Sequence, residues 1–272
     1  MACANHTSKP FNNPDMQEIV SKNLERTVNL AIFLPPSYEK NINQTYKILF
    51  VNDGQDADAL QLASTLKDLY AQNQIQELIV VAIAAHDRIQ EYGTLAMPDY
   101  KQRGSKAFQY NQFILEELKP FIEQNYRGNP LAKAGFIGFS LGGLSAFDVV
   151  WANSTVFDRA GVFSGALWWR RKAYEEGYQE DNDRIMHLTV RNSTFKSGLK
   201  MWFQAGTEDE TSDRNNNGII DAIDDTLDLI KELKRKGYND QDIKYLEIEG
   251  GKHDQSTWAK AIPDFLLWAY PK

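Results

Sequence analysis

Apolar and polar residues alternate along this chain in blocks that predict strands and helices in turn. In some segments apolar residues recur every three or four positions, which predicts amphipathic helices. These segments are 57–72 and stretches that end near 126, 236 and 268. Short and nearly continuous apolar runs, typical of strands buried on both faces, occur at 28–34, 47–52, 78–84, 134–137, 160–164, 200–205 and 243–248. The pattern therefore predicts an α/β fold in which a mostly parallel sheet is covered by helices on both faces.

The length of the chain is compatible with one large core. At 272 residues the chain could fold as a single α/β domain, and it contains no internal repeat, low-complexity tract or linker-like segment. The first periodic segment begins well after the start. We predict a loose polar tail over residues 1–17 and a single domain over residues 18–272.

Residues 138–142 read Gly-Phe-Ser-Leu-Gly, between the apolar run 134–137 and a small-residue segment that begins a helix. A serine nucleophile is commonly presented in this way, on a sharp strand-to-helix turn whose flanking glycines allow strand and helix to pass closely. A serine in an ordinary glycine turn would explain the pentapeptide alone, but the strand and helix on the correct sides favour the nucleophile. Ser140 is the candidate nucleophile.

A serine hydroxyl needs a base to take its proton, and the chain has four histidines. His6 lies in the polar tail, His187 lies in a strand-like or otherwise buried apolar run, and His86 follows the end of a strand. His253 follows another strand through a glycine-rich segment and precedes a helix, which is where this arrangement places its base. We predict His253 as the base, with helix capping by a loop histidine as the alternative.

The acid that orients the base is expected between the serine and the histidine in chain order. The strand-like run 200–205 is followed by Gly-Thr-Glu-Asp-Glu at 206–210. Asp209 is the predicted acid and Glu208 is its alternative. A solvated acidic turn would also explain the segment.

Acyl transfer creates an oxyanion that fixed hydrogen-bond donors must stabilise. One donor is expected to be the backbone N–H after the nucleophile, that of Leu141. The second is expected from the loop after the strand 47–52, where Gly54 permits a tight turn and the Gln55 N–H is the candidate. An ordinary Asp-Gly turn is the alternative at this loop.

These segments together resemble the putative esterase family of α/β-hydrolases, which includes esterase D, enterochelin esterases, feruloyl esterases and mycolyltransferases. The resemblance implies an α/β-hydrolase fold, a catalytic triad of Ser140, Asp209 and His253, oxyanion donors at Leu141 and Gln55, and hydrolysis of a carboxylic ester. It covers about residues 25–270 and rests on the segments 53–55, 138–143, 206–209 and 251–254, followed by Trp258 and 263–266.

The resemblance leaves the acyl and alcohol parts of the substrate open. Some relatives transfer the acyl group to a sugar alcohol in place of water, so an acyltransferase is the main alternative. A catalytically inactive binding domain is a third interpretation, which the intact serine, aspartate and histidine disfavour.

A second chemical signal lies at 213–224, which fits a twelve-residue calcium loop. The loop has glycine at its sixth position, and its last ligand position holds aspartate, as in dockerins, in place of the usual glutamate. A helix is expected after the loop, but none clearly precedes it, and an Asn/Gly turn with acidic residues is the alternative. We predict a structural Ca²⁺ and no cofactor for catalysis, with the ion held by Asp213, Asn215, Asn217, the carbonyl of Ile219, Asp221 and Asp224.

The substrate pocket is marked more weakly. Trp168 and Trp169 leave the end of one predicted strand, and Arg88 and Tyr92 lie in the loop after another. We predict that these four residues contact substrate. Tryptophans more often serve in packing, and arginines more often carry surface charge.

Charge and hydropathy exclude several other classes of protein. The net charge is −7 without a clustered basic stripe, which argues against nucleic-acid binding. No apolar stretch approaches the length of about 18 residues that a membrane-spanning helix needs. The start of the chain lacks the pattern of a secretory signal, so we expect a cytoplasmic protein, or a periplasmic or secreted one if a leader was removed. The expected partner is a small-molecule ester, and the oligomeric state stays open.

Overall fold

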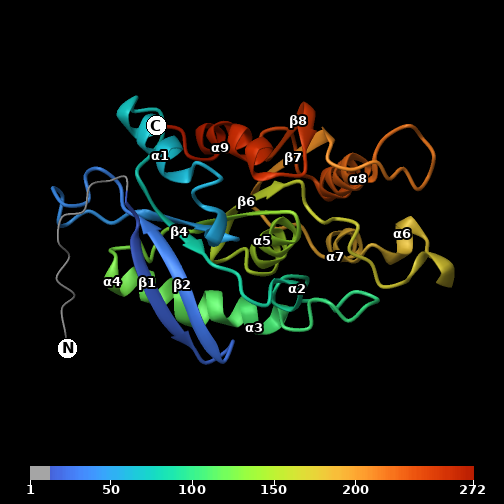
Figure 1. The fold of residues 1–272 in the computed structure, drawn as a ribbon, viewed down its shortest axis with the longest axis horizontal. Coiled ribbons are helices and arrows are strands. Elements are labelled where there is room, and N and C mark those ends of the chain that lie inside the picture. The colour runs from blue at the N-terminus through green and yellow to red at the C-terminus, as the bar shows by residue number, and fades with distance from the viewer. Residues whose placement is uncertain (1–12) are drawn as a thin grey trace.

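A computed structural model describes residues 13–272 as helices packed around one eight-stranded sheet (Figure 1). The sheet order is β1-β2-β4-β3-β5-β6-β7-β8. The first two strands are antiparallel to their neighbours, and every pairing from β4 to β8 is parallel, which confirms the predicted mostly parallel sheet. The strands are β1 (Asp15–Ser21), β2 (Arg26–Phe33), β3 (Lys47–Val51), β4 (Leu78–Ile83), β5 (Ala134–Phe139), β6 (Phe157–Phe163), β7 (Lys200–Glu208) and β8 (Ile243–Lys252).

Helices cover both faces of this sheet. Three of them follow strands that carry the candidate residues: α5 follows β5, α8 lies between β7 and β8, and α9 follows β8. The α-helices are α1 (Leu62–Ala71), α2 (Arg88–Glu91), α3 (Ala107–Gln112), α4 (Lys119–Asn125), α5 (Leu141–Ala152), α6 (Glu180–Asp183), α7 (Ile185–Asn192), α8 (Asp221–Lys236) and α9 (Gln255–Ala269). Short 3₁₀ turns form at Gly54–Asp56 and Tyr174–Glu176, and a π-helical segment at Phe113–Leu118 joins α3 to α4.

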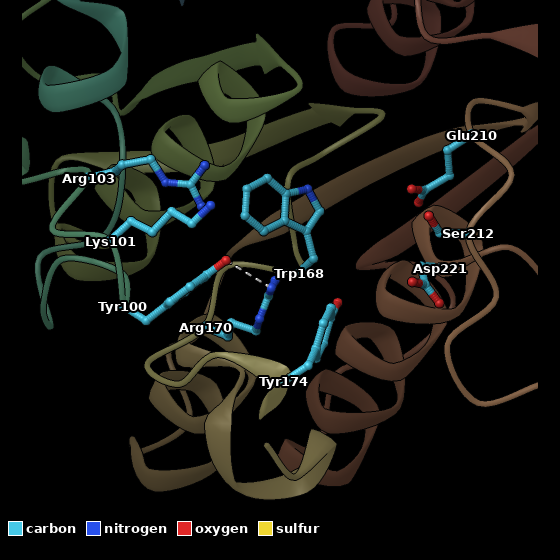
Figure 2. A pocket seen from close by; sticks show the side chains of 9 residues that line it. All are labelled: Tyr100, Lys101, Arg103, Trp168, Arg170, Tyr174, Glu210, Ser212 and Asp221. Carbon is cyan, nitrogen blue, oxygen red and sulfur yellow. Dashed lines mark hydrogen bonds between the residues drawn. The ribbon is translucent and has the colours of Figure 1, made fainter. Parts of the chain in front are cut away.

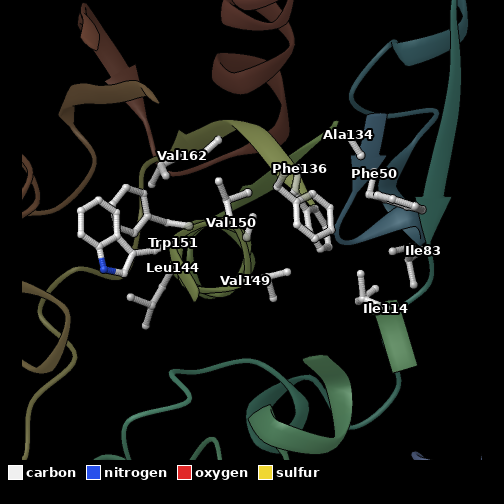
Figure 3. Close-up of a cluster of buried hydrophobic side chains, with 14 of the residues drawn as sticks. Phe50, Ile83, Ile114, Ala134, Phe136, Leu144, Val149, Val150, Trp151 and Val162 are labelled. Carbon is white, nitrogen blue, oxygen red and sulfur yellow. The ribbon is translucent and has the colours of Figure 1, made fainter. Parts of the chain in front are cut away.

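The strand residues divide the apolar core into two layers because successive side chains on a strand point to opposite faces. In β3, Ile48 and Phe50 pack on the face covered by α5, whereas Leu49 and Val51 pack on the face covered by α1 and α9. Figure 3 shows Phe50 among side chains that come from β5 and α5. The sheet is thus packed on both faces, and the residues that follow its strands are available to form a site at the edge of the sheet.

The predicted tail is wrong for its last residues. Residues 15–17 lie in β1, which pairs along its whole length with β2. Met16 and Val20 are 63% and 77% exposed, and Ile19 is the apolar residue that faces the core. Because this edge strand has few buried apolar residues, its sequence shows no apolar run of the kind that predicts a strand. Residues 1–12, with His6, lie outside the described part of the chain.

The run that contains His187, predicted as strand-like or otherwise buried, forms the buried helix α7. A six-residue run with four apolar residues fits a buried helix as well as a buried strand. Here Ile185, Met186 and Val190 pack into the core that α8 shares, and this tertiary contact selects the helix. No helix within residues 13–272 combines the length and the apolar character needed to cross a membrane.

Candidate active site

The candidate residues come together because the parallel strands all end at one edge of the sheet. Ser140 follows β5, Ser164 follows β6, Asp209 follows β7 and His253 follows β8, and these four strands are consecutive in the sheet. The carboxyl ends of parallel strands are where sites of open α/β sheets lie. The loop that begins at Asn52 follows β3, the neighbour of β5, at the same edge.

Ser140 sits on a strained turn between β5 and α5. Its backbone has φ 55° and ψ −123°, a conformation that a side chain rarely adopts. A Cβ on Gly138 would lie 2.2 Å from the carbonyl oxygen of Gly142, and a Cβ on Gly142 would lie 2.5 Å from the Asp53 carboxylate. Both glycines of the pentapeptide are therefore required by close approach, as a nucleophile elbow demands.

The loop after β3 is tied to this elbow by one arginine. Arg88 donates from Nε and Nη2 to the carboxylate of Asp53, at 2.7 and 3.1 Å, and from Nη2 to the carbonyl oxygen of Phe139, at 3.0 Å. Asp53 itself has a left-handed backbone, and its N–H donates to the hydroxyl of Tyr92 at 3.1 Å. The two segments that carry the predicted oxyanion donors are thus fixed to one another.

Those predicted donors both lie at helix starts. Leu141 is the first residue of α5, and Gln55 is in the 3₁₀ turn Gly54–Asp56. Amides in the first turn of a helix have no carbonyl partner within it. Both N–H groups are therefore suited to meet an oxyanion.

His253 lies beside Asp209 and not beside Glu208. The Nδ1 atom of His253 is 4.0 Å from Oδ1 of Asp209, whose side chain is fully buried. The side chain of Glu208 is 60% exposed and lies 4.0 Å from the ammonium group of Lys252. Of the two candidate acids, Asp209 has the placement that the role requires.

A hydrogen-bonded pair that the sequence analysis missed holds this carboxylate. Ser164 Oγ donates to Oδ1 of Asp209 at 3.0 Å, and the indole Nε1 of Trp258 donates to Ser164 Oγ at 2.9 Å. The Gly206 N–H donates to the other carboxylate oxygen at 3.1 Å. The Trp258 ring also packs edge-to-face on the His253 ring, with centroids 5.2 Å apart. Trp258 therefore contacts the candidate base and supports the candidate acid.

Burial shifts the pKa values of both members of this pair. Removal from water raises the pKa of Asp209 above its usual value, although the hydrogen bonds from Gly206 and Ser164 act to lower it. Removal from water lowers the pKa of His253, and the nearby charge of Asp209 opposes that fall. A histidine with a pKa below its usual value of about 6.5 is neutral at pH 7 and can accept a proton.

The remaining histidines of the described chain have other surroundings. His187 is buried, its Nε2 lies 2.8 Å from the carbonyl oxygen of Asp225, and burial lowers its pKa to about 3. It is a packed, neutral side chain, as its apolar run suggested. His86 lines a separate cavity with Arg26 and Lys106.

Comparison with known proteins identifies the family. Residues 21–269 match the family described as "Putative esterase". The chain belongs to this family. It is accordingly a carboxylic ester hydrolase, as the resemblance implied.

Individual relatives are distant in sequence but span nearly the whole chain. The Bacillus subtilis (strain 168) protein YbbA is 23% identical over 248 residues, which cover 89% of this chain and 92% of YbbA. A solved ferulic acid esterase superposes with a TM-score of 0.72 at 18% identity, over 94% of this chain and 97% of its own. The siderophore hydrolase EstA from Aspergillus nidulans superposes with a TM-score of 0.70 at 15% identity, over 97% and 99% of the two chains. The structural likeness establishes the shared fold.

A cavity of about 270 Å³ is lined by residues from the loops that follow β6 and β7 (Figure 2). Trp168 and Arg170 come from the first of these loops and Glu210 from the second, directly after Asp209. Tyr100 and Lys101 line the same side as Arg170, opposite Glu210 (Figure 2). Of the four predicted substrate contacts, Trp168 is the one that lines this cavity.

Two of the other predicted substrate contacts are corrected by their burial. Tyr92 and Trp169 are fully buried, Tyr92 with its hydroxyl on the Asp53 N–H and Trp169 against the backbone of Gly104. Large aromatic side chains gain most by packing, and these two pack beneath the site instead of facing it. Arg88 is partly exposed but engaged with Asp53 and Phe139, as described above.

The predicted calcium loop has a compact turn that leads into α8. The carboxylate of Asp213 accepts the N–H groups of Asn217 and Gly218, at 3.1 and 2.9 Å. The side-chain amides of Asn215 and Asn217 donate to Oδ2 of Asp224, at 2.9 and 2.6 Å. Four of the predicted ligand side chains therefore lie within one hydrogen-bonded group.

The other predicted ligands of this loop lie differently. Asp221 begins α8 and is turned to Arg214, with its Oδ2 3.2 Å from Nη1 of Arg214 and its Oδ1 accepting the Arg214 N–H. Ile219 is 39% exposed in the loop. Within residues 13–272, no three His, Cys, Asp or Glu side chains are grouped so as to hold a metal ion.

Proposed function

We propose that this esterase is a serine hydrolase in which Ser140 is the nucleophile, His253 the general base and Asp209 the residue that orients the base. One observation carries the proposal. The strained turn at Ser140 lies at the same sheet edge as a buried carboxylate beside a histidine. That combination is what an activated serine requires.

The proposed reaction proceeds in two halves. Ser140 Oγ attacks the carbonyl carbon of the ester while His253 takes the hydroxyl proton, and the oxyanion is met by the N–H groups of Leu141 and Gln55. Collapse breaks the bond to the alcohol, which leaves with the proton from His253. Water then attacks the acyl-enzyme with His253 as base, releases the acid and restores the Ser140 hydroxyl.

Hydrolysis of simple activated esters tests this proposal. The purified protein should release p-nitrophenol from p-nitrophenyl acetate and butyrate with saturation kinetics. Product analysis in the presence of a sugar alcohol then separates the two fates of the acyl group. Free acid as the main product supports a hydrolase, whereas a predominant new ester at low alcohol concentration would make the protein an acyltransferase. No turnover of any ester would contradict the proposal.

The loop 213–224 is proposed as a structural calcium site. The support is the convergence of Asp213, Asn215, Asn217 and Asp224 at the start of α8, since carboxylate and amide oxygens are the ligands that Ca²⁺ prefers. Ca²⁺ could replace the hydrogen bonds that now join these side chains. An ordered loop here would stabilise the segment that follows Asp209, and the ion would have no part in the chemical steps.

Calcium should therefore raise the thermal stability of the protein. An ion at a hundredfold excess over its dissociation constant stabilises the folded state by about 2.7 kcal/mol. Chelation is expected to lower the Tm, and Ca²⁺ should restore it better than Mg²⁺, which favours a smaller octahedral site. Asp213→Ala should abolish the response, whereas Asp240→Ala, at an exposed carboxylate beyond α8, should keep it. Identical melting curves for metal-free protein with and without millimolar Ca²⁺ would exclude the site.

A further inference from the structure

Arg170 is a buried cation that has no anionic partner within residues 13–272. The residue is 8% exposed. Within residues 13–272, its side chain donates a hydrogen bond from Nη2 to the hydroxyl of Tyr100, at 3.2 Å. Its Nε is buried, and no group in the described part of the chain forms a hydrogen bond with it. The neighbouring arginines differ, because Arg171 pairs with Asp183 and Arg184 pairs with Asp225.

A guanidinium removed from water is costly unless an anion or hydrogen-bond acceptors replace the lost solvent. Aromatic rings offset part of this cost here, since the Arg170 guanidinium lies 3.9 Å from the ring centroid of Tyr174 and 4.7 Å from that of Tyr100. A guanidinium has five N–H donors in a planar fork that matches a carboxylate. Most of this capacity is unused in Arg170.

The cavity places this cation near one flat aromatic side chain, that of Trp168. Figure 2 shows Arg170 between Tyr100 and Tyr174, with the indole of Trp168 facing the open space. Lys101 adds a second positive charge on the same side, over the ring of Tyr100. The volume of about 270 Å³ suits one ring-sized group and not an extended chain.

The opposite wall carries carboxylates that do not neutralise Arg170. Asp221 is paired with Arg214. Burial raises the pKa of Glu210, and the charge of Asp221 raises it further. Arg103, the other arginine of the cavity, is neutralised by a salt bridge to Asp99. Arg170 and Lys101 are thus the groups that define the charge of the ligand.

We propose that this cavity binds an anionic group of the ester substrate, a carboxylate carried on a planar ring, with Arg170 as its main contact. The inference rests on the proposed esterase function and names its substrate class. Residues that line the cavity are close in the chain to residues of the candidate active site. Glu210 directly follows Asp209, and Trp168 lies on the loop that begins at Ser164. A ring held against Trp168 would bring its ester group toward the same edge of the sheet as Ser140.

Two pairs of esters of matched shape test the inference. Monomethyl terephthalate and methyl terephthalamate differ only by a carboxylate or a neutral amide on the acyl side. The pair para-acetoxybenzoate and para-acetoxybenzamide makes the same comparison on the alcohol side. For at least one pair, we expect kcat/KM of the wild type to favour the anionic ester about tenfold or more, the size expected for a charge-assisted hydrogen bond.

Variants then assign this preference to Arg170. In Arg170→Gln the ratio of kcat/KM for the anionic ester to that for the neutral ester should fall close to one, and Arg170→Lys should restore part of it. Lys172→Gln removes the same charge from an exposed position outside the cavity and should keep the wild-type ratio. The Tm of each variant is measured, so that unfolding is not mistaken for loss of the ratio.

The outcomes separate this inference from the proposed function. The anion site would be overturned if hydrolysis depends on Ser140 but both members of both pairs react at equal rates. An unchanged ratio in Arg170→Gln would overturn it too. Either result would leave the proposed esterase function intact. If no ester is hydrolysed, calorimetric titration of the wild type with monomethyl terephthalate still decides. Binding that weakens in Arg170→Gln supports the site, and absent or unchanged binding rejects it.

Discussion

Replacing Ser140 with alanine is expected to abolish nearly all ester hydrolysis, with a loss in kcat on the order of 10⁶-fold. The reason is that Ser140→Ala removes the atom that forms the acyl-enzyme, and no other hydroxyl lies on the strained turn between β5 and α5. Residual turnover should come from the oxyanion donors at Leu141 and Gln55. Release of p-nitrophenol under saturating ester measures the effect.

Stability provides the control for this result. Loss of one hydroxyl at a strained position should leave the Tm almost unchanged, because Ser140 contributes to the fold through its backbone, whose N–H donates to the Phe163 carbonyl at 2.8 Å. Ser145→Ala is the matched variant, since Ser145 lies in the helix α5 that follows Ser140 and has no part in the proposed chemistry. Wild-type turnover in Ser140→Ala would refute the nucleophile assignment.

The elbow was predictable from sequence because its constraint is local. Gly138 is fixed by the backbone of Gly142 and Gly143, a few residues away, and a strand before and a helix after the pentapeptide can be recognised by apolar content. Gly142 is constrained by the distant Asp53 carboxylate, which the sequence did not show. The placement of Asp209 and His253 was predictable for a different reason. Parallel strands end at a common edge, so residues far apart in the chain are brought together once the strands are identified.

The support of the site depends on contacts that leave no local pattern. The bond from Trp258 to Ser164 joins α9 to the end of β6, 94 residues apart in the chain, and the sequence does not show that the two side chains meet. The burial of Tyr92 and Trp169 is decided by packing of distant segments, and the same holds for the helical state of α7. The cavity around Arg170 likewise depends on the meeting of three loops.

Replacing Asp209 with asparagine is expected to leave the fold intact and to lower kcat by about 10⁴-fold. The carboxylate beside Nδ1 of His253 fixes the ring orientation and stabilises the imidazolium that forms when Ser140 gives up its proton. An amide of the same shape can keep the contacts to Ser164 and Gly206 but lacks the charge. Glu208→Gln is the matched control, because it neutralises the adjacent, exposed carboxylate and should cost little.

The pH dependence distinguishes this role from simple loss of packing. In the wild type, kcat/KM should fall as the pH drops through the pKa of His253, which burial places below its ordinary value. The charge of Asp209 raises that pKa, so Asp209→Asn should lower it further and move the acid limb to lower pH. The variant should therefore be slower than the wild type at every pH. Its own maximal kcat/KM should nevertheless persist to a lower pH than the maximum of the wild type. An acid limb that stays in place or moves to higher pH would contradict the pairing of Asp209 with His253, and a larger loss in Glu208→Gln would transfer the role to Glu208.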